Sequence, residues 1–254
     1  MRKNRKRIRI IKIIINVVLV IIILSAFLSF VFFSGVFSIK EIQVVNNSKV
    51  DSETIIQNSG IQKGKNLFLV SDSKVRQSLQ QVPYIESSTI NKKIPNKVEI
   101  SVVERTVYLY IKVNEEYYAI DKKGMVLEKV ENIDGNKITI ILSKESDSIS
   151  IGNLLSEKDI EKVKNVESIL KVAESNDISS LITQFDLTNE QNVIIDLASE
   201  SKRVYLGSFS DDINLNVKFF WLKTMLEQEK GKSGIIYLNG DLNKNKVVFS
   251  EQSL

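Results

Sequence analysis

The chain has 254 residues, with 35 Lys plus Arg, 31 Asp plus Glu and a formal net charge of +4. It contains no Cys and no His, which excludes disulfides, thiol nucleophiles, Ser-His-Asp catalysis and most zinc or copper enzymes. The charge is unevenly distributed, because residues 1–12 hold seven cations and no acid, whereas the remaining residues carry a net charge of −3. The mildly basic average is therefore no sign of nucleic-acid binding, and we expect none.

The segment after this basic head is uncharged from Ile13 to Ile39. Eighteen of the 21 residues in Ile13–Phe33 are apolar, and a helix of that length spans roughly 31 Å, about one bilayer core. A buried core helix is disfavoured because the run has no polar face. A cleaved signal peptide is disfavoured because its apolar region is about 7–15 residues long and ends in a small-residue site. We predict a transmembrane signal anchor over residues 13–36.

All the cations of the basic head precede this predicted anchor. The positive-inside rule then places residues 1–12 in the cytoplasm as a short basic tail. The body of the chain lies on the other side of the membrane. We therefore expect a single-pass protein of the cell membrane with an extracytoplasmic C-terminal body.

The first part of the body, residues 37–106, has the pattern of a small α+β domain. Its expected order is strand, helix, helix, strand, strand, within about 70 residues. Asp51 and Asp72 are plausible N-caps for the two helices, which end near Gly60 and Pro83. The expected strands are Ser38–Val45, Ser87–Lys93 and Val98–Val103.

The second part, residues 107–250, is rich in strand patterns and holds two amphipathic helices, and residues 251–254 form a short tail. The clearer helix is Ser156–Ser175, and the other is Asp211–Glu229, with Ile213, Val217, Phe220, Trp221 and Leu222 available for packing. The expected strands are Val107–Val113, Tyr117–Ile120, one beginning at Met125–Leu127, Ile138–Leu142, Thr183–Leu187, Val193–Leu197, Arg203–Leu206, Ile235–Leu238 and Lys246–Ser250.

Motifs that would carry chemistry are weak. Gly231-Lys232-Ser233 lacks the upstream glycine of a phosphate loop, and Ser71-x-x-Lys74 lacks the two further motifs of a penicillin-binding enzyme. Paired acids at Glu115-Glu116 and Asp211-Asp212 fall where solvated acids are expected. Packing within a sheet explains the alternating tyrosines better than a sugar-binding platform does: Tyr108, Tyr110, Tyr117 and Tyr118. We expect no catalytic set, metal or cofactor.

The feature that points to a function is the last predicted hairpin, Ile235–Leu238 with Lys246–Ser250. A strand at the end of a sheet leaves backbone groups unpaired, and a partner can add a strand there. The alternative is an inner strand, or an edge guarded by Lys244 and Lys246. We predict a partner-binding site at the end of this hairpin, formed by Tyr237, Leu238, Val247, Val248 and Phe249.

Several motifs occur in a fixed order behind the anchor. They are an entry strand at Phe37–Asn47, G-K-N-L-F at Gly64–Phe68, V-P-Y-I at Val82–Ile85, I-P-N-K-V-E-I-S-V-V-E-R at Ile94–Arg105, Y-A-I-D-K-K-G-M-V at Tyr118–Val126 and V-Y-L-G at Val204–Gly207. This layout resembles the bacterial cell-division family FtsQ, called DivIB in Gram-positive bacteria. The chain departs from the family pattern most towards its end, and Thr106-Val107 stands where the family often has a proline.

The resemblance implies a transmembrane helix, a POTRA domain and a mixed β domain with two helices. It also implies a non-enzymatic divisome scaffold that binds FtsL and FtsB (DivIC) and helps control the septal peptidoglycan synthase at the division septum. Two alternatives stay open. One is a POTRA-bearing component of a protein export or assembly machine, and the other is a membrane-anchored cell-wall enzyme that uses carboxylates.

Overall fold

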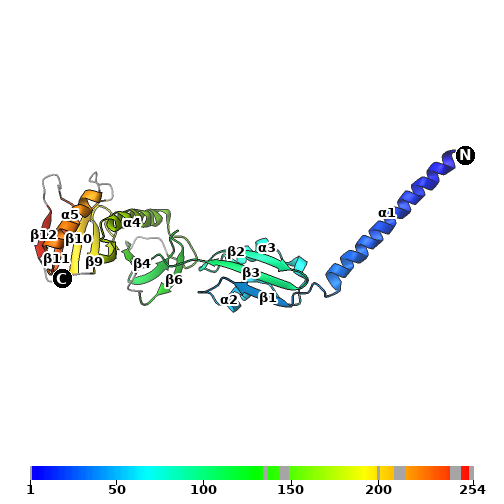
Figure 1. Ribbon diagram of the computed structural model, residues 1–254, viewed down its shortest axis with the longest axis horizontal. Coiled ribbons are helices and arrows are strands. Elements are labelled where there is room, and N and C mark those ends of the chain that lie inside the picture. Colours follow the sequence, from blue (N-terminus) through cyan, green and yellow to red (C-terminus); the bar gives the residue numbers. More distant parts are fainter. Residues whose placement is uncertain are drawn as a thin grey trace. The chain divides into compact units, whose positions relative to one another are not determined.

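The computed structural model describes residues 2–133, 137–142, 149–198, 201–208, 215–240 and 247–251. The fold is α+β, as predicted, with an apolar N-terminal helix, a small sheet with two helices and a large sheet with two longer helices (Figure 1). The chain divides into two compact units, of which the first ends at Glu104 and the second begins at Arg105.

The N-terminal helix α1 extends from Arg2 to Phe33. Its stretch Ile11–Phe33 is 23 residues long and apolar enough to cross a membrane, and none of its most apolar window is buried inside the structure. A core helix of a soluble protein would instead be covered by its own domain. The helix therefore fits a single transmembrane segment.

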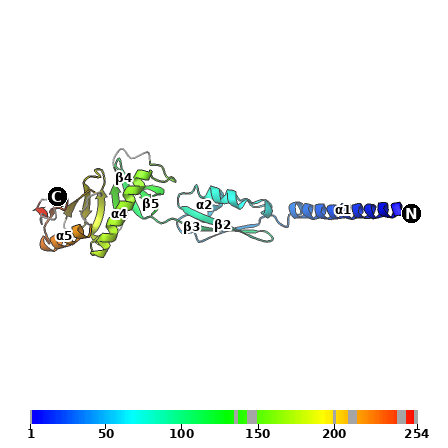
Figure 2. The ribbon, with the colours of Figure 1, turned by 90° about the horizontal axis from the view of Figure 1, so that it is seen from above.

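The first unit contains the predicted strand–helix–helix–strand–strand order, with a short 3₁₀ turn before the second helix. Its elements are β1 (Glu41–Val45), α2 (Ser52–Ser59), η1 (Leu67–Leu69), α3 (Asp72–Leu79), β2 (Ile85–Lys93) and β3 (Lys97–Glu104). The strands lie in the order β1-β3-β2, with β1 parallel and β2 antiparallel to β3. The two helices cover one face of this sheet (Figure 2), towards which β3 directs the buried side chains of Val98, Ile100 and Val102.

Local capping explains where these helices begin and end. The Asp51 carboxylate accepts a hydrogen bond of 2.8 Å from the Thr54 amide, and Gly60 ends α2 in the left-handed conformation with φ of +67°, both as predicted. The prediction for α3 was wrong by one residue. Ser71 occupies the N-cap, and Asp72 instead forms an ion pair of 3.1 Å with Lys92.

Glu104 and Arg105, the adjacent residues at which the two units meet in the sequence, form hydrogen bonds in the first and second unit, respectively. Glu104 accepts hydrogen bonds from the backbone amides of Ser48, Lys49 and Val50 at 2.8–3.0 Å, which holds the loop between β1 and α2. Arg105 donates to Asp121 at 2.6 Å within the second unit. The ion pair between Arg105 and Asp121 is largely buried, with side-chain exposures of 13% and 8%.

The second unit is built on a sheet of nine strands with the order β12-β11-β10-β9-β8-β7-β4-β5-β6. The pairs β4/β7, β7/β8 and β10/β11 are parallel and the others antiparallel. Its elements are β4 (Leu109–Val113), β5 (Glu116–Ile120), β6 (Val126–Val130), β7 (Thr139–Ile141), α4 (Glu157–Ser175), η2 (Ser179–Leu181), β8 (Ile182–Asp186), β9 (Val193–Leu197), β10 (Lys202–Gly207), α5 (Leu215–Gln228), β11 (Gly234–Tyr237) and β12 (Val248–Glu251).

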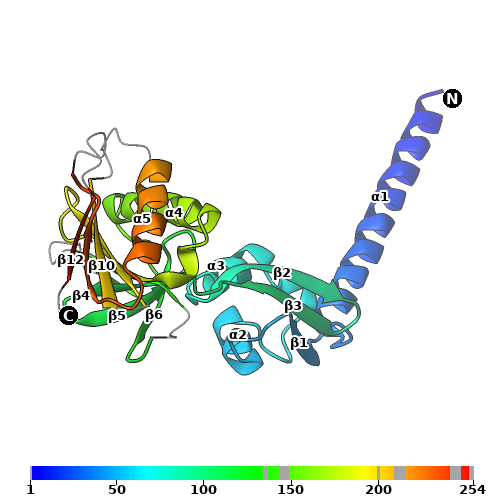
Figure 3. The ribbon, with the colours of Figure 1, turned by 60° about the vertical axis from the view of Figure 1, so that its left-hand side comes forward.

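Helices α4 and α5 lie on the same face of this sheet (Figure 3). The predicted stripe of α4 is confirmed, because Val163, Val166, Ile169 and Ala173 are buried and Ile160 and Leu170 pack against the core. The strands contribute alternate residues to this core, such as Val193, Ile195 and Leu197 of β9. On the opposite face, Arg203, Tyr205 and Tyr237 are partly exposed.

Helix α5 differs from its prediction. Leu222 is buried and Trp221 packs against the core, but Val217 and Phe220 are exposed. The buried side chains on α5 include Phe219 and Lys218, and the Lys218 ammonium donates to the Leu206 carbonyl at 2.7 Å. The sequence pattern therefore placed the helix correctly and its apolar face only in part. The predicted core residue Ile213 lies outside the described residues.

Candidate functional site

Strand β12 is the terminal strand of the nine-stranded sheet. It pairs antiparallel with β11 through Tyr237↔Val248, Ile236↔Phe249, Ile235↔Ser250 and Gly234↔Glu251. In the described part of the chain, no strand lies on its other side. Alternate backbone N–H and C=O groups of β12 therefore point away from the sheet, ready to pair with an added strand.

The two apolar side chains of β12 point to opposite faces. Val248 is opposite Tyr237 on the face without helices and is 52% exposed. Phe249 is opposite the buried Ile236 and packs against the core. Its ring lies over Gly234, where an added Cβ would come within 2.9 Å of the ring and 2.4 Å of the Ser250 carbonyl oxygen. Glycine at this position lets β12 and its aromatic ring lie close to β11.

The other predicted site residues occupy different environments. Tyr237 is partly buried at the end of β11, and its ring stacks on Tyr205 with centroids 5.2 Å apart. Val247 immediately precedes β12 and packs against the core. Leu238 is completely buried and cannot meet a partner through its side chain. Of the five predicted residues, Val248 therefore offers the most accessible apolar surface.

The face next to this edge has its own pattern of side chains. Register places Ile194, Tyr205, Tyr237 and Val248 in one row across four strands. In the neighbouring row, the Asp196 carboxylate accepts a hydrogen bond of 2.7 Å from Arg203 and raises the pKa of its guanidinium. A strand added next to β12 would extend the row that contains Tyr205, Tyr237 and Val248, beside the Asp196–Arg203 pair. The sequence pattern missed Tyr205 and Gly234, whose roles depend on strand order.

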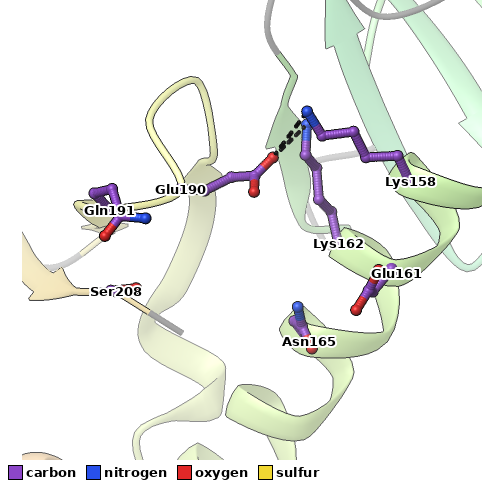
Figure 4. Close-up of a pocket in the computed structure, with 7 residues that line it drawn as sticks. All are labelled: Lys158, Glu161, Lys162, Asn165, Glu190, Gln191 and Ser208. Atoms are coloured by element: carbon purple, nitrogen blue, oxygen red, sulfur yellow. Dashed lines mark ion pairs between the residues drawn. The ribbon is translucent and has the colours of Figure 1, made fainter. Parts of the chain in front are cut away.

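A second candidate site is a cavity of about 240 Å³ between α4 and the β8–β9 turn (Figure 4). Glu190 lies 3.5 Å from the Lys158 ammonium and 3.3 Å from that of Lys162, and Lys162 also lies 3.4 Å from Asp159. Its cations and carboxylates thus neutralise one another. The cavity offers no separated acid and base, and we assign no chemistry to it.

The weaker sequence motifs have structural explanations where the structure describes them. Glu115 pairs with Lys112, Glu116 with Lys129, and Lys232 with Glu229. Tyr110 is buried, and Tyr108 and Tyr118 pack against the core, as expected for tyrosines of a sheet. The pair Asp211-Asp212 lies outside the described residues. Among the described residues, no three His, Cys, Asp or Glu side chains form a group that would hold a metal ion.

Comparison with known proteins identifies the family. A family profile described as "POTRA domain, FtsQ-type" matches residues 37–105, the segment that ends with the E-R pair. The cell division protein DivIB of Clostridium botulinum (strain Loch Maree / Type A3) is 32% identical over 218 residues, which cover 85% of this chain and 83% of that protein. The chain belongs to the FtsQ/DivIB family.

Other cell division proteins align with a similar share of this chain. The cell division protein DivIB of Clostridium tetani is 29% identical over 84% of this chain and 79% of its own length. The cell division protein FtsQ of Syntrophotalea carbinolica is 25% identical over 85% of this chain and 75% of its own length. These names support a role in cell division, and they favour it over protein export and over a carboxylate enzyme.

Proposed function

We propose that this FtsQ/DivIB protein is a non-enzymatic scaffold of the division machinery that binds bitopic partners through the free edge of β12. The partners expected from the family resemblance are FtsL and FtsB (DivIC), through which the scaffold would help control septal peptidoglycan synthesis. The observation that carries this proposal is the terminal position of β12, with Val248 exposed beside backbone groups that no strand in the described part of the chain pairs.

The rest of the chain is proposed to hold this edge at the membrane. Residues 1–12 would be the cytoplasmic tail and residues 13–36 the anchor, because the seven cations precede the apolar stretch. Residues 37–106 would form the POTRA domain and residues 107–250 the β domain, both outside the cell, with a tail at 251–254. The site would then lie on the extracytoplasmic side of the membrane, where bitopic partners also expose their extracytoplasmic segments.

Binding is tested by co-purifying the full chain with co-expressed FtsL- and DivIC-type proteins from the same genome. Val248→Asp is expected to weaken partner capture by at least about tenfold, because it places a charge in the apolar centre of the contact. Val248→Pro tests the backbone at the same position, since proline donates no hydrogen bond. Phe249→Glu is a poorer probe, because Phe249 packs against the core and its loss also disturbs the fold.

The matched control is Val217→Asp, which places the same charge on α5 at a valine of similar exposure, 43%. This variant should capture the partners as the unchanged chain does. Unaltered capture by both Val248 variants would refute the site at β12. Equal losses in the Val217 and Val248 variants would attribute the effect to a general change of the β domain.

A further inference from the structure

The start of the POTRA domain gathers three segments that are distant in sequence. The Leu67 amide donates to the Phe37 carbonyl at 2.8 Å, and the Ile39 amide donates to the Lys65 carbonyl at 2.9 Å. The Lys40 amide donates to the Asn96 carbonyl at 2.8 Å. Residues 36–41, 60–69 and 92–99 therefore meet where β1 begins, and we call them the entry surface.

The entry surface is tied closely to the end of the apolar helix. Only four peptide units join Phe33, the last residue of α1, to Phe37, and they span at most about 14 Å when fully extended. The Asn66 side chain also donates to the carbonyl of Val31 at 2.8 Å, in the last turn of α1. Wherever the POTRA domain points, this surface stays within reach of the headgroup layer of a bilayer that α1 crosses.

The entry surface exposes large apolar side chains. Leu69 and Ile94 are 68% and 67% exposed, and Phe68 is also exposed while its ring packs on Phe37 with centroids 5.1 Å apart. The Lys92 ammonium donates to the Val70 carbonyl at 2.6 Å, which links the end of η1 to the β2–β3 turn that carries Ile94. Side chains of this size, exposed together at one end of a small domain, indicate a contact surface.

The charges of the same segments are mostly positive. They contain six lysines and two glutamates: Lys40, Lys63, Lys65, Lys92, Lys93 and Lys97 with Glu41 and Glu99. Glu41 pairs with Lys97 and Glu99 with Lys93, so the glutamates are already engaged. Lys40, Lys63 and Lys65 are exposed, and among the described residues no ion pair involves them. Apolar side chains surrounded by lysines are typical of surfaces that rest on anionic lipid.

We propose that the entry surface lies against the anionic surface of the bilayer that α1 crosses, with Leu69 and Ile94 in the headgroup layer and Lys40, Lys63 and Lys65 on lipid phosphates. The contact would limit the directions in which the POTRA domain can point from the membrane. The proposal rests on the anchoring by α1 and is independent of partner binding at β12.

The test uses the full chain reconstituted in vesicles of phosphatidylcholine, with or without phosphatidylglycerol. The chain has no Cys, so Leu69→Cys, Ile94→Cys and Val103→Cys each accept one environment-sensitive dye. Val103 is the matched control, because it is an exposed valine at the far end of β3, 54% exposed and about 20 Å along the strand from Lys97. Dyes at Leu69 and Ile94 should shift to shorter wavelength and be quenched by headgroup-labelled lipid in anionic vesicles, whereas the dye at Val103 should not.

The charge contribution is tested by adding Lys40→Gln, Lys63→Gln and Lys65→Gln to the labelled Ile94→Cys chain. Quenching in anionic vesicles should then fall to the level seen in neutral vesicles, and high salt should have the same effect. Equal quenching at all three dye positions, or none at Leu69 and Ile94, would overturn the proposal, as would equal quenching in neutral and anionic vesicles. Failure of the chains to float with vesicles would overturn the anchoring itself and the proposal with it.

Discussion

Two adjacent side chains, Glu104 and Arg105, fasten the chain on either side of its division into two units. Glu104 binds three backbone amides of the first unit, and Arg105 pairs with Asp121 in the second. Asp121 in turn accepts hydrogen bonds of 2.8 Å from the amides of Lys123 and Met125, which shapes the turn before β6. The E-R and I-D-x-x-G motifs thus hold the backbone in place through hydrogen bonds.

Glu104 also gives the first unit a dependence on pH. Partial burial alone would raise the pKa of Glu104, but the hydrogen bonds from the Lys49, Val50 and Ser48 amides outweigh it and lower the pKa. A carboxylate with a lowered folded-state pKa contributes stability above its unfolded pKa, and this is lost as pH falls through the folded pKa. Glu104→Gln should lower the free energy of unfolding by about 1–2 kcal/mol at neutral pH.

This change is measured by urea unfolding at neutral pH and at a pH below the lowered folded-state pKa of Glu104. The difference between Glu104→Gln and the unchanged chain should shrink at acid pH, because the carboxylate is then protonated in both states of the unchanged chain. Glu41→Gln is the control, since Glu41 forms an exposed pair with Lys97 that contributes little. A difference that stays constant with pH would contradict the role given to Glu104.

The elements vary in how well the sequence predicts them. Asp51 and Gly60 fix the limits of α2 through local chemistry, and the stripe of α4 follows from helical period, so both were predictable. The exposure of Phe220 was not, because it depends on how α5 sits on the sheet. The complete burial of Leu238 likewise depends on tertiary packing. The order of the strands is set by long-range pairing, which no local pattern reports.

In the pair of strands β11 and β12, the close approach of β12 to β11 depends on Gly234. Gly234→Ala would bring a methyl group within 2.4 Å of the Ser250 carbonyl and 2.9 Å of the Phe249 ring. We expect β12 to move away from β11, with a loss of about 1–3 kcal/mol in stability and a loss of partner capture. Hydrogen exchange measures the displacement directly.

In the Gly234→Ala variant, the amides of Val248–Glu251 should exchange faster while those of β9 stay protected. Ser233→Ala, one residue earlier, adds no atom and is the control. Unchanged protection of β12 would mean that the strand adapts to the methyl group, and the tight seating described for Phe249 would then be wrong.

At the scale of the whole molecule, each unit has a core of its own. Ile55, Leu67, Leu79, Val98 and Ile100 are buried in the first unit, and the large cluster that joins α4 and α5 to the nine-stranded sheet lies in the second. We therefore expect the two units to unfold separately.

We expect calorimetry of the full chain in detergent to resolve two transitions. Ile100→Ala removes a completely buried side chain from the first unit and should lower one transition, by about 2–5 kcal/mol in stability. Ile195→Ala does the same in the second unit and should lower the other transition alone. Two transitions that move together in either variant would show that the units unfold as one.

The strand order of the large sheet has a consequence for how the sheet is assembled. From β8 to β12, every strand pairs with the strand that precedes it in the chain. Such a sheet can grow in one direction as the chain folds, since each new strand pairs with a strand that already precedes it in the chain. If a partner protein adds a strand to β12, as proposed, that strand would extend the sheet by one further pairing.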